Sequence, residues 1–262
     1  MLIKYEEILL KKRLQQPLTK SLDKSNKKAV KMTKNNRLLW VDALRGFAIV
    51  LMIIFHFCYD MHYFGWVDWN IPNGPSWSPL RYLIISLSTF TVGLSLVLAD
   101  QRQTLQQTFI KRMVQLLSGA ACVTVMSLFL FPRAWIYFGI LHFIVVGSLI
   151  SVMFVKIPKL ALALGCAVLV GFWSSLLKSD WPFEFFYQLL PRYTEDLVPL
   201  FPWLGVMLIG MGLGGLLPIN KYDVPKNSIT KPLAIMGRHG LIIYLIHQPL
   251  LFGGFILVQM LR

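Results

Sequence analysis

The sequence predicts an all-α protein, a polytopic transmembrane helical bundle of about seven spans with its N-terminus in the cytoplasm. Hydrophobic residues make up 56% of the chain and charged residues 15%, whereas soluble domains average about 45–50% and about 25%. Apolar runs approaching the ~20 residues of a transmembrane helix recur along the chain. Basic residues gather in every second connection between these runs.

Seven apolar runs form the predicted spans, at residues 39–59, 80–99, 113–131, 135–155, 160–177, 199–217 and 241–261. The basic connections are residues 101–112, 156–159 and 218–238. Together with the N-terminal segment, they all fall on one side of the predicted membrane. Cytoplasmic loops carry an excess of Lys and Arg, so this side is expected to be the cytoplasm. An odd number of spans then places the C-terminus outside.

Residues 1–36 are expected to form a mobile cytoplasmic arm, followed by a transmembrane domain over residues 37–262. Up to residue 38, eleven Lys and Arg residues stand against three acidic residues. Beside a membrane span, such charge sets topology and contacts anionic lipid. We therefore expect membrane lipid, and no nucleic acid, as a partner. Met32 stands just before the domain and is an alternative to Met1 as the native start.

The first apolar run keeps the ionisable residues Asp42, Arg45 and His56, and Asp60 follows directly after it. Arg45 and His56 are eleven residues apart, close to three whole helical turns, so both lie on one face about 16 Å apart along the axis. The aspartates lie three residues before Arg45 and four after His56, within reach along the same helix. Charges are costly inside lipid. This face is therefore expected to form either an internal ion pair or a polar path across the membrane.

Four sequence blocks carry a resemblance to a known family. The first block is DALRG, together with the apolar run and the His that follow it. The other blocks are YFGILHF (137–143), DLVPLFPWLG (196–205) and GRHGLIIYLIHQPL (237–250). In this order they resemble the bacterial heparan-α-glucosaminide N-acetyltransferase catalytic-domain family, from about Arg37 to the C-terminus. The spacing of Arg45 and His56 also resembles the membrane O-acyltransferases of acyltransferase family three.

The resemblance implies an integral-membrane acyltransferase of the bacterial plasma (inner) membrane. Its co-substrate would be acetyl-CoA or another acyl-CoA from the cytoplasm. Its acceptor would be an amine or hydroxyl of a sugar or glycolipid outside. The sequence leaves open the identity of the acceptor, direct transfer or an acyl-histidine intermediate, and whether the protein is a homo-oligomer.

The candidate catalytic residues are His56, Asp60 and His62. A carboxylate beside an imidazole can fix one tautomer and stabilise the protonated form, as a general base requires. His56 is therefore expected to be the base, with Asp60 as its partner. In the lysosomal enzymes that this family resembles, the essential His lies in the loop after the first span. This chain has no His in residues 63–79, which leaves His56 or His62 as the acid/base.

The candidate cofactor-binding residues are Arg45, Arg238, His239, His142 and His247. Guanidinium groups bind phosphates well, so Arg45, Arg238 and His239 are expected to meet the phosphates of the coenzyme. The alternative is ordinary positive charge at the cytoplasmic face. His142 and His247 are expected near mid-membrane. There they either line a cavity or form satisfied interhelical hydrogen bonds.

The candidate acceptor-binding residues are Trp66, Arg192 and Asp196, on the outer side. Acidic and aromatic groups suit a sugar, although Trp near span ends also serves as an interfacial anchor. The three cysteines show no C-x-x-C spacing, so no metal site is expected. Another functional class stays open: a small-solute or lipid transporter could use the same polar face, and transporters usually show repeated halves or broken spans.

Overall fold

The structure is a computed structural model that describes residues 38–72, 74–179, 181–186, 188–191, 193–219 and 225–261. The chain divides into two units, residues 1–38 and 39–262, and all described helices belong to the second. The predicted arm at residues 1–36 lies outside the described residues.

The described residues fold into helices, which confirms the all-α class. The long helices are α2 (Leu39–Tyr63), α3 (Trp77–Gln101), α4 (Leu105–Leu130) and α9 (Gly240–Met260). The shorter ones are α5 (Ile140–Ser151), α6 (Pro158–Trp173), α7 (Trp203–Leu216) and α8 (Thr230–Arg238), with the 3-10 turns η1 (Val152–Phe154) and η2 (Phe183–Phe186).

Four helices are long and apolar enough to cross a membrane, namely α2, α3, α4 and α9. The other predicted spans correspond to α5, α6 and α7, which are apolar but have 12, 16 and 14 residues. At ~1.5 Å per residue they are shorter than a bilayer core of ~30 Å. Seven complete spans therefore stay a prediction. The fourth predicted span begins late because residues 135–139 are not helical.

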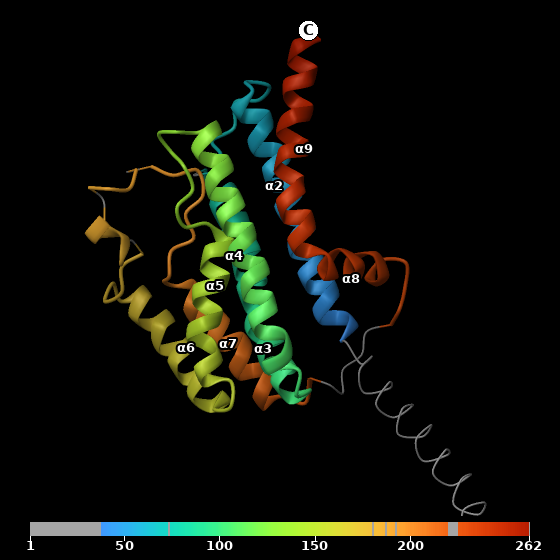
Figure 1. Ribbon diagram of the computed structural model, residues 1–262, viewed down its shortest axis with the longest axis vertical. Coiled ribbons are helices and arrows are strands. Elements are labelled where there is room, and N and C mark those ends of the chain that lie inside the picture. Colours follow the sequence, from blue (N-terminus) through green and yellow to red (C-terminus); the bar gives the residue numbers. More distant parts are fainter. Residues whose placement is uncertain are drawn as a thin grey trace, which may run out of the picture. The chain divides into compact units, whose positions relative to one another are not determined.

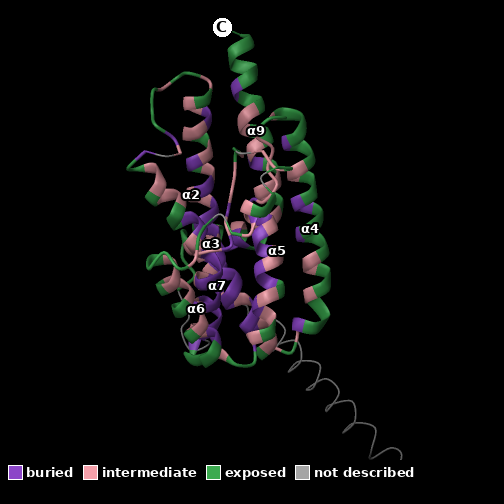
Figure 2. Cartoon of the chain, turned by 90° about the vertical axis from the view of Figure 1, so that its left-hand side faces the viewer, coloured by how far each residue is buried: buried purple, intermediate pink, exposed green. Residues whose placement is uncertain are grey.

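The helices are arranged around α3, which packs against α2 on one side and α7 on another (Figure 1). Helix α7 lies between α3 and α6, while α4 packs on α5. The α3–α4 and α5–α6 connections lie at the end of the bundle where α2 begins (Figure 1). Figure 2 shows that burial is concentrated in α3 and α7, whereas α4 and the end of α9 are exposed.

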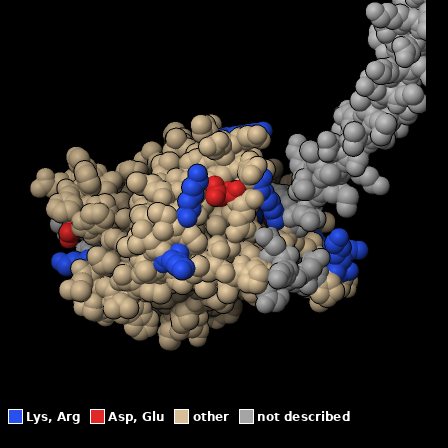
Figure 3. Space-filling model, turned by 90° about the horizontal axis from the view of Figure 1, so that it is seen from below, with Lys and Arg blue, Asp and Glu red and all other residues tan. Residues whose placement is uncertain are grey.

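The exposed surfaces of α4 and α9 are largely apolar. Phe129, Leu250 and Met260 are examples of large apolar side chains with little cover. Such surfaces fit the lipid contact expected of membrane-spanning helices. Seen from below, the described surface is mostly uncharged, with patches of Lys and Arg around a small acidic group (Figure 3).

Candidate active site

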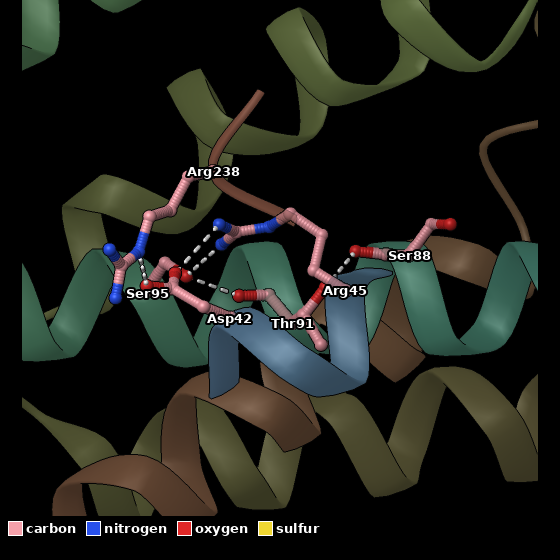
Figure 4. A network of polar contacts seen from close by, with 6 residues as sticks. All are labelled: Asp42, Arg45, Ser88, Thr91, Ser95 and Arg238. Atoms are coloured by element: carbon pink, nitrogen blue, oxygen red, sulfur yellow. Dashed lines mark hydrogen bonds and ion pairs between the residues drawn. The ribbon is translucent and has the colours of Figure 1, made fainter. Parts of the chain in front are cut away.

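At the beginning of α2, two arginines share one buried carboxylate (Figure 4). Arg238 Nε donates to Asp42 Oδ2 at 3.1 Å, and Arg45 Nη1 lies 3.6 Å from Asp42 Oδ1. The Asp42 side chain is 7% exposed, while that of Arg238 is 41% exposed. Within the part of the chain that the structure describes, two guanidinium groups against one carboxylate leave a net positive charge, which suits an anionic ligand.

Helix α3 fixes the orientation of Arg45. Arg45 Nη2 donates to Ser95 Oγ at 2.6 Å, and Ser95 Oγ donates to the Thr91 carbonyl at 2.6 Å. Thr91 Oγ1 in turn donates to the Ser88 carbonyl at 2.9 Å. Because its guanidinium is held between Asp42 and α3, Arg45 is positioned before any ligand binds.

Two glycines bring α8 and its Arg238 onto α2. A Cβ atom on Gly237 would overlap the Asp42 carbonyl oxygen, and one on Gly46 would overlap the Leu233 carbonyl oxygen. The absence of side chains at both positions therefore lets the two backbones touch. This contact places Arg238 beside Asp42, although the two residues are 196 positions apart.

At the other end of the same face of α2, two imidazole rings are in contact. The centroids of His56 and His247 are 4.8 Å apart, with an interplanar angle of 83°. His56 Nδ1 lies 2.9 Å from the Met52 carbonyl, and His247 Nδ1 lies 2.6 Å from the Tyr244 carbonyl. A carbonyl oxygen only accepts, so each Nδ1 carries a hydrogen when its ring is neutral, and each Nε2 then has a free lone pair.

Asp60 is fully buried but is not the partner of His56. Its Oδ1 accepts a hydrogen bond of 2.9 Å from Gln248 Nε2 on α9. Among the described side chains, no hydrogen bond or ion pair joins Asp60 to His56. The structure thus does not bring the expected carboxylate–imidazole pair into contact, and Asp60 instead ties α2 to α9.

Asp196 lies close enough to interact electrostatically with His56, His142 and Tyr244. Arg81 Nη2 of α3 is 3.4 Å from Asp196 Oδ1 and donates to the Leu197 carbonyl at 2.8 Å. The segment that carries Asp196 is held by Phe138, whose carbonyl accepts from the Val198 N–H at 3.0 Å. The charges of Asp196 and Arg81 therefore act on His56 from outside α2.

Residues 37–249 match the model of one protein family, described as heparan-alpha-glucosaminide N-acetyltransferase, catalytic. The chain belongs to this family. The predicted resemblance is thereby confirmed. No curated protein and no solved structure matches the chain. The family is one of membrane acetyltransferases with acetyl-CoA as donor.

In the fold, the four sequence blocks that resemble this N-acetyltransferase family come together in pairs. Gly46 of the first block meets α8 immediately before the last block, and Gly237 opens that last block. The second and third blocks meet where a Cβ on Gly139 would lie 2.9 Å from Asp196 Oδ2. The first and last blocks also bring His56 against His247, whereas the second and third blocks bring Asp196 beside Gly139.

His142 has a protein partner at both ring nitrogens. Thr124 Oγ1 donates to the Ile136 carbonyl at 2.8 Å, so it accepts from His142 Nε2–H at 3.1 Å. His142 Nδ1 then accepts from the Gly139 N–H at 3.2 Å. These contacts correspond to the satisfied interhelical hydrogen bonds considered for this residue. Its part in binding a coenzyme stays a prediction.

The remaining predicted residues lie further out. His239 is exposed beside Arg238. His62 Nδ1 is 3.3 Å from the Val67 carbonyl. His62 and Trp66 line one open recess with Gly65, Val67 and Asp68, and Trp66 contacts Phe255 edge to face. Arg192 lies outside the described residues.

Sequence reasoning left several polar contacts of these clusters out of the candidate site. Asp42 was recognisable, because it lies three residues before Arg45. Arg81 gave no local signal, and neither did the pairing of Tyr59 with Glu195, in which the hydroxyl donates to the Glu195 carboxylate at 2.6 Å. Within the described residues, no group of three or more His, Cys, Asp or Glu is placed to hold a metal ion.

Apolar side chains separate the two clusters along α2. Ile49 and Met52 lie between Arg45 and His56 and are each 8% exposed. Tyr244 of α9 packs against the same cluster of side chains. A donor whose phosphates lie at Arg45 must displace these side chains to bring its acyl group to His56.

Proposed function

We propose that this protein transfers an acetyl group from cytoplasmic acetyl-CoA to an amine or hydroxyl of a sugar or glycoconjugate outside the bacterial plasma membrane. The observation that carries the proposal is the pair of polar clusters on one face of α2. One cluster is cationic and suits phosphates, and the other holds two imidazoles beside a carboxylate. Their spacing along α2 is about 16 Å, which calls for a donor with a long arm.

The donor would bind at the end where α2 begins. The phosphates of acetyl-CoA would meet Arg238, which is partly exposed, and Arg45, which α3 already orients. Asp42 keeps both guanidinium groups in place without cancelling their combined charge. His239 extends the same surface. The thioester arm would then run along α2, past Ile49 and Met52.

The acceptor would bind near Asp196, with Trp66 and His62 at the outer recess. A carboxylate attracts the amine of a sugar, and an exposed indole offers a flat surface to its ring. His56 would remove a proton from the attacking amine or hydroxyl through its Nε2 lone pair, because the Nδ1–H donates to Met52. The same geometry serves direct transfer and an acyl-histidine intermediate.

The proposal includes a topology. All seven apolar helices would cross the membrane with the start of α2 in the cytoplasm, so the arginine cluster would face the donor. Residues 1–36 would form a mobile arm on the same side, in contact with anionic lipid. The basic connections that gather at this end of the bundle support the orientation through the positive-inside rule (Figure 1).

Arg238→Gln and Arg45→Gln are each expected to weaken acetyl-CoA binding by about tenfold or more, since a hydrogen bond to a charged group contributes ~1.5–3 kcal/mol. Detergent-purified protein titrated with acetyl-CoA in a calorimeter measures the effect. Arg133→Gln is the matched control, because Arg133 is an exposed arginine between α4 and α5.

If the wild-type protein neither binds acetyl-CoA nor transfers its acetyl group, the proposed function is wrong. This result would favour the alternative function of a small-solute or lipid transporter. If wild-type protein binds acetyl-CoA but both glutamine variants bind equally well, the donor site lies elsewhere.

Asp196→Asn is expected to raise the KM for an amino-sugar acceptor at least tenfold while leaving the KM for acetyl-CoA unchanged, because the loss falls on charge pairing with the acceptor. Radiolabelled acetyl transfer to methyl β-glucosaminide measures both constants. Asp100→Asn, in the last turn of α3, provides the comparison. An equal rise in the KM for the acceptor in both variants, or a change in the KM for acetyl-CoA alone, would count against an acceptor site at Asp196.

A further inference from the structure

His247 has an environment that coenzyme binding does not explain. It is 8% exposed, and its Nε2 atom is buried without a hydrogen-bond partner among the described residues. A buried acceptor left without a partner costs free energy, of the order of 1–3 kcal/mol. Such an atom in a packed interior calls for a function.

Among the described histidines, only His247 has a buried ring nitrogen without a hydrogen-bond partner, and its ring contacts His56. Both rings are anchored in the same way, with Nδ1–H donating to the carbonyl of a residue earlier in the same helix. Each ring therefore keeps one basic nitrogen. The ring centroids are 4.8 Å apart. Because His247 Nε2 has no hydrogen-bond partner among the described residues, a proton from His56 would reach it through one bridging water.

We propose that His247 is a second proton-transfer residue, which receives the proton from His56 and delivers it to the thiolate leaving group. This inference rests on the proposed function. His247 comes from α9 and His56 from α2, so the reaction would require both helices in contact. The contact is supported by the Gln248–Asp60 hydrogen bond one residue further along α9.

The proposed step balances as follows. A neutral amine forms a bond to the thioester carbonyl carbon, and the carbonyl π electrons move to oxygen. His56 Nε2 takes a proton from the amine nitrogen. The oxyanion then re-forms the C=O bond as the C–S bond breaks and its electron pair stays on sulfur. The proton passes from His56 to His247 Nε2 and on to the sulfur. The products are the amide and the thiol of coenzyme A, and both histidines end neutral.

The structure also explains why two residues would divide this work. His56 lies nearer Asp196, whose charge acts on it, so it faces the proposed acceptor. His247 is more deeply buried, and its ring contacts Tyr244, which packs with Ile49 and Met52 along the proposed path of the donor. Each imidazole is thus next to the reactant whose proton it handles.

The test compares two donors that differ in one atom, acetyl-CoA and acetyl-selenocoenzyme A, with methyl β-glucosaminide as acceptor. A selenolate is a weaker base than a thiolate and leaves without a proton. His247→Gln is expected to lower kcat with acetyl-CoA by about 10²-fold and to leave the KM for acetyl-CoA within about threefold. The selenoester should restore kcat to within about tenfold of wild type.

His56→Gln serves as the contrast, because its task concerns the acceptor, and the selenoester should not restore it. The double variant should be no slower than His56→Gln alone, since residues that act as a unit are non-additive. His247→Asn and a thermal unfolding curve in detergent separate loss of chemistry from loss of fold.

Three results would overturn the proposal while leaving the proposed function intact: near-normal kcat for both His247 variants, equal losses with both donors, or a rise in the KM for acetyl-CoA without a fall in kcat. The last result would make His247 a coenzyme ligand. Absence of acetyl transfer by the wild-type protein would instead defeat the proposed function, and this inference with it.

Discussion

Replacing His56 by glutamine is expected to lower kcat for acetyl transfer by about 10²–10⁴-fold, the usual contribution of a well-placed general base. Glutamine is similar in size and places an amide near the position of Nε2, but it cannot accept a proton from the acceptor. Binding of acetyl-CoA should persist, because the arginine cluster lies about three helical turns away. Single-turnover transfer of radiolabelled acetyl groups and a calorimetric titration measure the two quantities.

Ile54→Ala is the matched control for this variant. Ile54 lies on the same helix two residues before His56, and it is 49% exposed. Its truncation removes no polar group, so kcat should stay within about threefold of wild type, as expected for a site away from the chemistry. A His56→Gln enzyme with nearly full turnover would remove His56 from the mechanism and leave His62 as the remaining candidate base.

Gly237→Val is expected to abolish the donor site by forcing α8 away from α2. The new Cβ would overlap the Asp42 carbonyl oxygen, and a helix backbone moves less readily than the end of a flexible side chain. Overpacking of this kind costs typically ~1–3 kcal/mol. The separation would also break the Arg238–Asp42 ion pair. A fall in the apparent Tm in detergent, together with loss of acetyl-CoA binding, is the expected result.

Gly253→Val provides the comparison, since a Cβ at Gly253 of α9 has no atom within 4 Å. It introduces the same side chain into a helix of the same protein without a clash. Equal behaviour of the two variants, whether both intact or both destabilised, would show that the α2–α8 contact is not what holds the donor site together.

The class of fold could be predicted from hydropathy, but the lengths of three helices could not. The residues before α5 illustrate the reason. Trp135, Ile136 and Phe138 are as apolar as a span, and hydropathy predicts that they form part of one. In the structure their carbonyls instead accept hydrogen bonds from Thr194, Thr124 and Val198. Hydropathy measures transfer into an apolar medium and does not show whether a distant segment supplies hydrogen-bond partners.

Helical spacing predicted contacts within α2 with mixed results. It correctly predicted the ion pair between Asp42 and Arg45. Arg238 also forms an ion pair with Asp42, but it does not displace Arg45. It did not predict that Asp60 binds Gln248 while His56 binds a backbone carbonyl. Spacing along one helix shows which partners are within reach, but the choice depends on groups that other helices bring to the same place.

In the proposed topology, the short helix α6 would also act on the lipid around the protein. Helix α6 rises about 24 Å and many of its residues are exposed, so in the proposed topology the hydrocarbon beside it must thin to meet its ends or leave the adjoining coil to span the difference. A thinned leaflet next to Asp196 would shorten the distance that an acceptor headgroup has to descend. The surrounding lipid would then influence the reaction, because the length of its acyl chains would set how far an acceptor headgroup must descend to reach Asp196.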